Sequence, residues 1–316
     1  MNSLMPKIQL QSDALVATFL ESKGTATRDA YRQDLRCFES YMVEVMGIVS
    51  LVASISLSSP ELNFLVLKYR DYLITKSLSP STVNRRLGAI RSLFKLARLL
   101  GHSTAEIEIQ NMKAESYRDT RGPGLPAFKR MINKAAEQSK MKAARDRAIL
   151  RLLFDLALRA SELVDLDLSH VDFEQKRISI KGKGRTQRQF LSIPATSVDA
   201  LTDWIATRGE AAGPLFFNLI RDLKTRKRLS RVGLYGVVRT LGENVQIKTR
   251  PHGIRHLSIS EACKVAQNNG YNLEEVMDHS RHKSVATLMI YRDRERDTQG
   301  AISTLVSNTI LEQEDE

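Results

Sequence analysis

The sequence of 316 residues contains only two cysteines, Cys37 and Cys263, and it has no run of about 18 apolar residues. Two cysteines so far apart, each in a helix-like stretch, argue against a disulfide framework or a thiolate metal site. Even the apolar stretch 149–158 is interrupted by Arg151 and Asp155, which excludes a membrane-spanning helix there. The start lacks the charged and then apolar layout of a signal peptide. We therefore expect a cytoplasmic protein in a reducing compartment.

Basic residues are in excess, because 48 Lys and Arg stand against 36 Asp and Glu and give a formal net charge of +12. The last six residues hold four of the acids and no Lys or Arg, so the rest of the chain is more basic still. Such a surplus favours a polyanionic partner. Hydrophobic residues make up 42% and charged residues 27%, which is typical of an ordered globular protein, and the length favours two domains.

From Ser12 to about Gly101 the chain shows helical periodicity throughout. Long amphipathic stretches lie at 25–46, 60–76 and 81–100, and a hydroxyl side chain that can cap free amides stands at or near each start. We expect four or five helices and no strand in this part of the chain.

Basic residues run along the predicted helix 81–100 beside its apolar stripe. Such a face is either an ordinary solvated surface or a phosphate-binding one, and the global charge leaves both interpretations open. Residues 113–125 then lose periodicity and gather Gly and Pro, which predicts a linker whose bases can lie along a phosphate backbone. The residues of these two segments that we single out for DNA binding are Arg85, Arg86, Arg91, Lys95, Arg118 and Arg121.

Beyond the linker the pattern becomes mixed. Residues 177–181 and 188–193 alternate as strands, and the glycines of the loop between them permit the positive φ of a hairpin turn. Trp204 is interpreted as a core residue. We expect a mainly α protein with a small antiparallel β-sheet. The helices predicted here are 127–137, 143–157, 197–207, 230–242, 254–268 and 284–292.

Four of the six histidines, His252, His256, His279 and His282, lie in one short region that also holds Arg255. Metal binding is disfavoured, because no pair has zincin-type spacing around a catalytic Glu and the neighbouring cations repel a divalent ion. Cationic donors fixed around a phosphate stabilise the charge that develops in phosphoryl transfer. The cluster therefore favours a cradle for a phosphodiester.

Three further polar residues in apolar surroundings complete this interpretation. Arg159 and Lys183 would add cations to the cradle, and a tyrosine such as Tyr291 beside it is a potential nucleophile. Each residue also has an ordinary explanation. Arg159 could be a helix C-terminal cation, Lys183 a turn lysine, and Tyr291 an aromatic at the edge of the core.

With these residues the chain resembles a tyrosine recombinase of the phage integrase family. Residues 157–163, Ala-Leu-Arg-Ala-Ser-Glu-Leu, resemble the first-arginine box, and 182–184 resemble the lysine hairpin. Residues 252–256, His-Gly-Ile-Arg-His, resemble the His-x-x-Arg box, and 281–292 the final histidine and nucleophile. Any one of these motifs alone is weak evidence of the family. Their order and separations carry the resemblance, which covers nearly the whole chain.

The resemblance implies a fold of two domains. An N-terminal helical core-binding (SAM-like) domain would occupy 8–112, and a C-terminal α+β catalytic domain would occupy 126–300. The basic linker 113–125 would join them so that they clamp duplex DNA. The tail 301–316 would form a helix that docks on a neighbouring subunit.

The resemblance also implies a role for each matched residue. Tyr291 would attack the scissile phosphate and form a 3′-phosphotyrosyl link, while Lys183 would protonate the departing 5′-oxygen. The two arginines and His282 would hold the non-bridging oxygens, and His252 would take the tyrosine proton or orient the phosphate. The implied catalytic set is Arg159, Lys183, His252, Arg255, His282 and Tyr291.

The chain departs from the family pattern at two positions. Ala157 and Arg281 each stand where the family usually has Gly, and we expect the first change to alter packing little. The second leaves the final histidine open between His279 and His282. The nine positions from His282 to Tyr291 favour His282, with His279 as a capping or supporting residue.

We therefore expect a site-specific DNA recombinase that needs no metal or cofactor and acts on double-stranded DNA as a homotetramer on two sites. It would be associated with the nucleoid and not with a membrane. Two alternatives stay open: a type IB topoisomerase-like relaxing enzyme, and a catalytically inactive DNA-binding regulator of the same fold.

Overall fold

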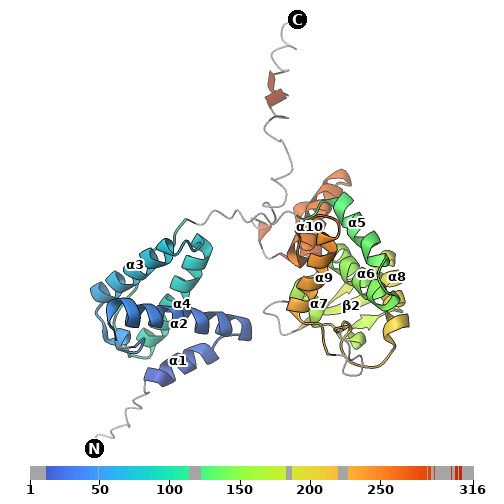
Figure 1. Ribbon diagram of the computed structural model, residues 1–316. Coiled ribbons are helices and arrows are strands. Elements are labelled where there is room, and N and C mark those ends of the chain that lie inside the picture. Colours follow the sequence, from blue (N-terminus) through green and yellow to red (C-terminus); the bar gives the residue numbers. More distant parts are fainter. Residues whose placement is uncertain are drawn as a thin grey trace, which may run out of the picture. The chain divides into compact units, whose positions relative to one another are not determined.

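The computed structural model describes residues 12–48, 50–113, 122–182, 187–219 and 227–282, together with 284–285, 288, 300, 303–304 and 306–307. The chain divides into two compact units, Met1–Ser116 and Tyr117–Glu316 (Figure 1). In the described ranges, no helix combines the length and the apolar character needed to cross a membrane.

Helices alone form the first unit, and its described residues contain no strand, as predicted. The three long helices begin and end within one residue of the expected positions, because the apolar periodicity and the capping residues agree. At α3, for example, the backbone N–H of Ser58 donates to Glu61 Oε2 at 2.9 Å. The helices of this unit are α1 (Ser12–Glu21), α2 (Thr25–Met46), the 3₁₀ turn η1 (Ala53–Ser56), α3 (Ser59–Thr75) and α4 (Pro80–Leu99).

The segment 102–113 runs without regular structure along α3 and α4. Asn84 of α4 donates to the carbonyl of Met112 at 2.9 Å and accepts from the N–H of the same residue at 2.8 Å. Asn63 of α3 likewise donates to the carbonyl of Glu106 and accepts from the N–H of Glu108. Each amide side chain therefore satisfies backbone groups as a neighbouring strand would, and the two together hold the segment against the helices.

The second unit combines helices with a three-stranded antiparallel sheet of order β1-β2-β3, which confirms the predicted fold class. The predicted hairpin is β2 paired with β3, with Ile178 opposite Leu191. The elements are α5 (Leu125–Ala136), α6 (Lys140–Asp155), α7 (Ala160–Val164), η2 (Leu168–His170), β1 (Val171–Asp172), β2 (Arg177–Lys181), β3 (Arg188–Ser192), α8 (Ala195–Arg208), α9 (Arg231–Glu243), α10 (Pro251–Asn268) and α11 (Leu273–Ser280).

The core of this unit surrounds α6, which packs against α5, α8 and α10 (Figure 1). Trp204 of α8 is fully buried, as predicted, and its indole N–H donates to the carbonyl of Leu215 at 2.8 Å. The side chain of Arg208, at the end of α8, is also buried and donates to the carbonyls of Gly209, Ala211 and Pro214. These bonds fix the loop that follows α8.

Besides the 3₁₀ turns η1 and η2, three short elements were not predicted: β1, α7 and α11. β1 has two residues and α7 has five, too few to show a period in the sequence. α11 has eight residues, and its start is set by a capping box in which Asn272 accepts from the backbone N–H groups of Glu274 and Glu275. That Asn-x-x-Glu pattern is visible in the sequence and was the missed signal.

The described end of the predicted linker belongs to the second unit. Gly122 packs against the first turn and a half of α10, where a Cβ atom would lie 2.5 Å from the carbonyl oxygen of Gly253 and from Leu257 Cβ. A side chain cannot fit at this position without a shift of backbone. Residue 122 is therefore an anchor for the chain that enters α5.

The amide contacts of Asn84 generate a prediction about the segment 102–113. In Asn84→Ala, the N–H and carbonyl of Met112 lose their partners, so the free energy of opening this segment should fall by about 1–3 kcal/mol. Hydrogen exchange at the amide of Met112 should accelerate accordingly. The matched control is Gln110→Ala, which shortens an exposed polar side chain of the same segment. Equal exchange in both variants would show that Asn84 does not hold the segment.

Candidate active site

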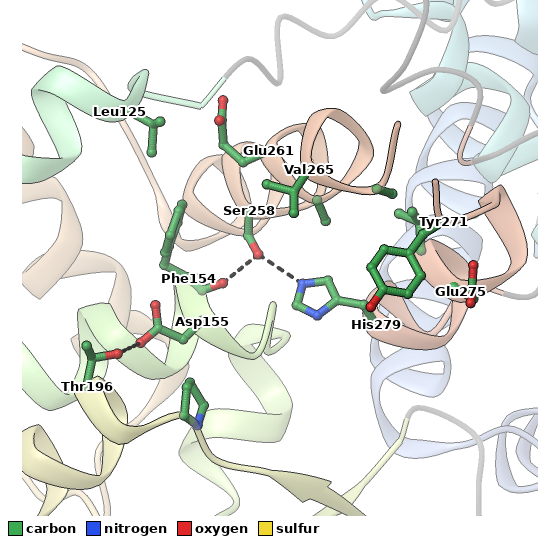
Figure 2. A pocket seen from close by; sticks show the side chains of 14 residues that line it. Leu125, Phe154, Asp155, Thr196, Ser258, Glu261, Val265, Tyr271, Glu275 and His279 are labelled. Atoms are coloured by element: carbon green, nitrogen blue, oxygen red, sulfur yellow. Dashed lines mark hydrogen bonds between the residues drawn. The ribbon is translucent and has the colours of Figure 1, made fainter. Parts of the chain in front are cut away.

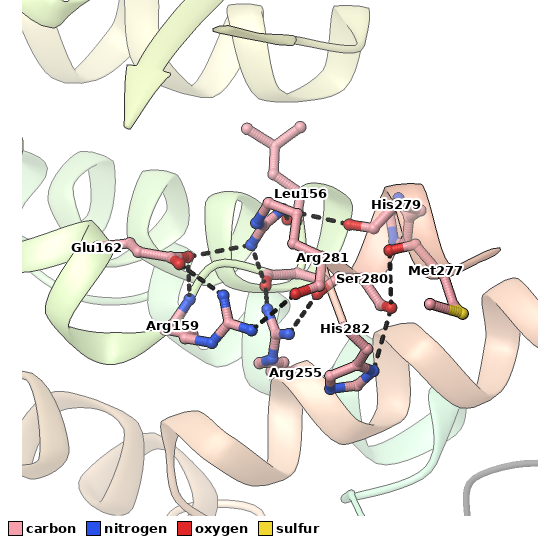
Figure 3. A network of polar contacts seen from close by, with 10 residues as sticks. Leu156, Arg159, Glu162, Arg255, Met277, His279, Ser280, Arg281 and His282 are labelled. Carbon is pink, nitrogen blue, oxygen red and sulfur yellow. Dashed lines mark hydrogen bonds and ion pairs between the residues drawn. The ribbon is translucent and has the colours of Figure 1, made fainter. Parts of the chain in front are cut away.

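Three separate stretches of the second unit bring Arg159, Arg255 and His282 together. Arg159 is the N-cap residue of α7, Arg255 lies in the second turn of α10, and His282 follows directly after α11. Figure 3 shows their side chains converging beside the carbonyls that end α6 and α11. Because Arg159 begins a helix, the alternative that it is a helix C-terminal cation is wrong.

The turn between α6 and α7 directs the carbonyl of Ala157 toward Arg255. Ala157 is fully buried and has a positive φ of 45°, a backbone conformation that favours glycine. Its carbonyl accepts hydrogen bonds from Arg255 Nη1 and Arg281 Nη2. The departure from Gly at position 157 therefore affects the backbone conformation, which the prediction of little change in packing did not consider.

Glu162 ties two of the arginines together (Figure 3). Its Oε1 accepts from Arg159 Nη1 at 2.7 Å, and its Oε2 accepts from the backbone N–H of Arg159 at 2.8 Å and from Arg281 Nη2 at 3.0 Å. Burial alone would raise the pKa of Glu162, but the charges of Arg281 and Arg159 and the bonds from Arg159 outweigh it, so the net pKa is lowered. One ionised carboxylate thus pairs with two guanidinium groups. Its single negative charge balances only one of the two positive charges, so one positive charge stays in excess.

Arg255 and Arg159 are both fixed by main-chain carbonyls near the end of α11. Arg255 Nη2 donates to the carbonyl of Ser280, and Arg159 Nη2 donates to the carbonyl of Arg281 at 3.1 Å. Arg255 is 2% exposed, whereas the side chain of Arg159 is 29% exposed and lies at the rim of the cluster. Guanidinium groups held in this way have a defined direction, which suits them to bidentate binding of an anion.

His282 lies among these cations. Its Nδ1 is 3.1 Å from Ser280 Oγ. Burial in the first place, and then the charges of Arg255, Arg159, Arg281 and His252, lower the pKa of His282 to about 4. The imidazole is therefore neutral at pH 7 in the protein without a bound anion. An anion that offsets the surrounding charge would raise this pKa.

The other three histidines of the sequence cluster occupy different positions. His252 is exposed in the first turn of α10, one turn before Arg255, and its charge acts on His282. His256 is buried on α10, with Nδ1 3.5 Å from Ser260 Oγ. His279 lines a separate pocket.

That pocket has a volume of about 860 Å³ and lies between α10, α11 and the end of α6 (Figure 2). His279 Nε2 is 3.4 Å from the hydroxyl of Ser258, which donates to the carbonyl of Phe154. Burial first, and then Arg281 and Arg255, lower the pKa of His279. The ring of His279 thus lies between α11 and α10, whereas His282 lies beside the arginines. The supporting role of His279 stays a prediction.

Several predicted site residues lie outside the described residues. Lys183 belongs to the stretch 183–186 and Tyr291 to 289–299. Arg118 and Arg121 belong to 114–121, and most of the tail 301–316 is also outside. Their predicted roles stay predictions.

The DNA-binding residues predicted on α4 have partners within the first unit. Arg85 pairs with the buried carboxylate of Asp34, and Arg86 Nε lies 3.8 Å from the other oxygen of the same group. Arg91 Nη1 donates to the carbonyl of Ile109 at 2.6 Å and so helps to hold the segment 102–113. These three residues therefore have a structural role, whether or not they also contact DNA.

Lys95 differs from the three arginines. Its side chain is exposed, and among the described residues it makes no hydrogen bond or ion pair. Of the four predicted residues on α4, Lys95 is the one whose charge is directed wholly to solvent. The sequence could not separate these cases, because all four residues lie on one helix beside the same apolar stripe.

Two site residues were missed as such by the sequence reasoning. Glu162 stands three positions after Arg159, which is the spacing of a capping box. Arg281 stands at a position where the family that the chain resembles usually has Gly. Both signals were visible in the sequence. Neither says that the two side chains meet, since 119 positions separate them.

Comparisons with known proteins agree with the motifs. Residues 128–297 match the model of the Phage integrase family. The Tyrosine recombinase slr0733 of Synechocystis sp. is 31% identical over 307 residues, which cover 95% of this chain and 96% of that protein. The Tyrosine recombinase Synpcc7942_B2651 of Synechococcus elongatus is 34% identical over 295 residues, 91% of each chain.

Among solved structures, the fold is similar to that of the XerH site-specific recombinase bound to a palindromic difH substrate in a post-cleavage complex. The TM-score is 0.68 at 17% sequence identity, and the match covers 94% of this chain and 85% of that one. At this identity the similarity shows the fold.

The environment of His282 generates a pH prediction. An unfolded histidine with a pKa of 6.5 takes up a proton that folded His282 does not accept until about pH 4. The unfolded chain therefore binds more protons between these values, and the free energy of unfolding should fall as the pH is lowered from about 6.5 toward 4. Denaturant unfolding across this range should show a shallower fall in His282→Gln.

NMR titration of the ring protons gives the direct measurement, with the resonance assigned by its loss in His282→Gln. His279→Gln is the control for the neighbouring histidine whose pKa is lowered in the same direction. A midpoint for His282 near the ordinary value would contradict the arrangement described here.

Proposed function

Because the chain belongs to the phage integrase family, as a tyrosine recombinase, we propose that it cleaves and rejoins double-stranded DNA at specific sites. The observation that carries the proposal is the convergence of Arg159, Arg255 and His282 from three chain segments, with more positive than negative charge among their neighbours. A phosphodiester is an anion that such a cluster binds. The matching motifs add a nucleophile, Tyr291, and a general acid, Lys183.

The proposed reaction has two transesterification steps. The phenol oxygen of Tyr291 attacks the scissile phosphorus, its proton passes to His252, and the bond from phosphorus to the 5′-oxygen breaks. Lys183 gives a proton to that oxygen, which leaves as a 5′-hydroxyl. A 5′-hydroxyl then attacks the phosphotyrosine, which restores the phosphodiester and frees Tyr291. The covalent link conserves the energy of the broken bond, so the steps need no nucleotide.

Arg159, Arg255 and His282 stabilise both transition states in this scheme. Each step places extra negative charge on the non-bridging oxygens, and fixed donors stabilise that charge without reorganising. His282 is neutral before DNA binds, so it can act as a hydrogen-bond donor without adding to the repulsion among the cations.

The assembly belongs to the same proposal. The XerH recombinase is bound to its difH substrate, and the Tn1549 transposon integrase, which has a similar fold, is in complex with transposon right end DNA. Both support double-stranded DNA as the partner of this chain. Strand exchange joins two DNA sites, and we propose that four copies assemble on them, associated with the nucleoid.

The covalent step gives a direct test. The protein is incubated with nicked suicide duplexes made from the DNA that flanks its gene, and a denaturing gel detects a protein–DNA adduct. Wild type should form the adduct, and Tyr291→Phe should form none, since a phenyl ring has no nucleophilic oxygen. Tyr271→Phe, an exposed tyrosine before α11, is the matched control and should retain the adduct.

An adduct in Tyr291→Phe would remove this residue from the role of nucleophile. A wild-type protein that binds these duplexes and forms no adduct would be a regulator. Relaxation of plasmids without exchange between two sites would indicate a topoisomerase. Sedimentation of the complex on two-site DNA measures the number of copies, and a value below four would contradict the tetramer.

A second prediction separates DNA contact from folding on α4. Lys95→Ala should weaken binding to a random-sequence duplex and reduce the slope of log K against log salt by about 0.9, the value for one phosphate contact. Arg91→Ala should change this slope less and should lower the melting temperature more, because it releases the carbonyl of Ile109. An unchanged slope in Lys95→Ala would show that Lys95 does not contact DNA.

A further inference from the structure

Arg281 ends α11 in a left-handed backbone conformation, with φ 56° and ψ 38°. Glycine adopts this conformation without strain, and a long side chain does so only where its surroundings hold it there. The chain therefore keeps an arginine at a position whose backbone favours glycine. The contacts of the side chain explain why an arginine can stand at this position.

Both terminal nitrogens of Arg281 donate to acceptors within the protein (Figure 3), and its Nε is buried with no hydrogen-bond partner among the described residues. Nη1 donates to the carbonyls of Leu156 at 2.9 Å and His279 at 3.2 Å, and Nη2 donates to the carbonyl of Ala157 at 2.8 Å and to Glu162 Oε2 at 3.0 Å. The side chain is 7% exposed. A phosphate outside the cluster therefore has little access to these donors.

Two of the four acceptors of Arg281 are also groups that orient Arg159 and Arg255. The carbonyl of Ala157 accepts from Arg255, and Glu162 accepts from both the side chain and the backbone of Arg159. In return, the carbonyl of Arg281 itself accepts from Arg159 at 3.1 Å. Arg281 thus joins the turn after α6, the start of α7 and the end of α11 into one unit.

We propose that Arg281 is a positioning residue for DNA cleavage: its planar guanidinium holds Glu162 and the carbonyl of Ala157 in the places from which they direct Arg159 and Arg255 toward the scissile phosphate. The proposal rests on the function proposed above. It assigns to Arg281 a role through other residues, and no contact with the DNA.

Charge supports this role. Among the groups that lower the pKa of Glu162 against its burial, the charge of Arg281 comes first, ahead of the bonds and charge of Arg159. Arg281 therefore favours the ionised form of Glu162, and an ionised carboxylate is the stronger acceptor for the guanidinium of Arg159. The geometry of the four hydrogen bonds from Nη1 and Nη2 matters as well. The ammonium group of a lysine side chain could not donate to four acceptors in one plane.

Four variants test the proposal. Arg281→Gly removes the guanidinium and relieves the left-handed backbone, so the chain should still fold. Arg281→Lys keeps the charge and loses the planar fork. Glu162→Gln keeps the shape of the carboxylate and loses its charge. Arg147→Ala is the control, since it also removes one arginine, from a surface ion pair with Asp203 between α6 and α8.

The rate of adduct formation is measured in single turnovers at saturating suicide duplex, beside the Kd for the same DNA. Arg281→Gly should slow the adduct about 10- to 100-fold, the size of effect expected when reacting groups are misplaced. Its Kd should stay within about twofold of wild type, because Arg281 does not touch the DNA. Arg281→Lys should not restore the rate. Arg147→Ala should match wild type in both.

Two further readouts separate positioning from a general loss of structure. The double variant Arg281→Gly/Glu162→Gln should be no slower than the slower single variant, because Arg281→Gly already releases Glu162 and Glu162→Gln acts only through that carboxylate. The pKa of His282, which faces Arg255, Arg159, Arg281 and His252, should rise in Arg281→Gly and stay low in Arg281→Lys. A variant that loses rate with this pattern, and melts as wild type does, has lost orientation and not its fold.

Other outcomes overturn the proposal. A rate for Arg281→Gly within twofold of wild type would show that the guanidinium is dispensable. A Kd that weakens as much as the rate falls would make Arg281 a DNA contact, and full rescue by Arg281→Lys would reduce its role to charge. If Arg281→Gly does not fold, the rate of Arg281→Lys decides the question. Failure of wild type itself to form an adduct would contradict the proposed function, and is distinct from all of these.

Discussion

The arrangement of this site depends on the ion pairs that the buried carboxylate of Glu162 makes with two guanidinium groups. The carboxylate joins Arg159, which begins α7, to Arg281, which ends α11. A buried charge is costly when it is unpaired, whereas one that accepts three hydrogen bonds from cationic and backbone donors is stable. Removal of either arginine would leave the charge of this carboxylate without enough positive charge beside it. The two ion pairs together hold the start of α7 and the end of α11 at a defined separation.

The backbone contributes to the same arrangement. Ala157 and Arg281 both have a positive φ, and these are the two positions where the family usually has Gly. Chain reversal at these points turns the carbonyls of residues 157 and 280 toward Arg255. Backbone strain of this kind persists where the surroundings overdetermine it and gathers at functional sites. Here the arginines supply the contacts that hold both turns, and the turns supply the acceptors that orient the arginines.

Much of the fold could be predicted from the sequence because its signals are local. Apolar periodicity and capping residues placed α2, α3 and α4 within one residue, and alternation placed the hairpin of β2 and β3. The short elements β1, α7 and α11 were not predicted, since their stability comes from caps and from packing rather than from a period. Order and spacing in the chain likewise selected Arg159, Arg255 and His282.

What could not be predicted depends on which side chains meet across the fold. Arg85 looked like a surface cation, yet it pairs with the buried carboxylate of Asp34, 51 positions away in the chain. The partnership of Glu162 with Arg281 spans 119 positions and was equally hidden. A helical stripe tells which face of a helix is polar, and it carries no information on whether a carboxylate from another segment lies opposite that face.

The amide contacts of Asn84 and the close packing of Gly122 have a consequence for the chain between them. Met112 is fixed on the first unit and Gly122 is packed in the second. The chain between them has ten residue steps and therefore spans at most roughly 35 Å. For the DNA binding proposed above, a tether of this length would make the two units a bivalent ligand. A unit held on a duplex would place the other at an effective concentration on the order of millimolar, so weak individual contacts would become strong together. Asn84, which fixes the point where the tether begins, would set this avidity through the backbone of Met112.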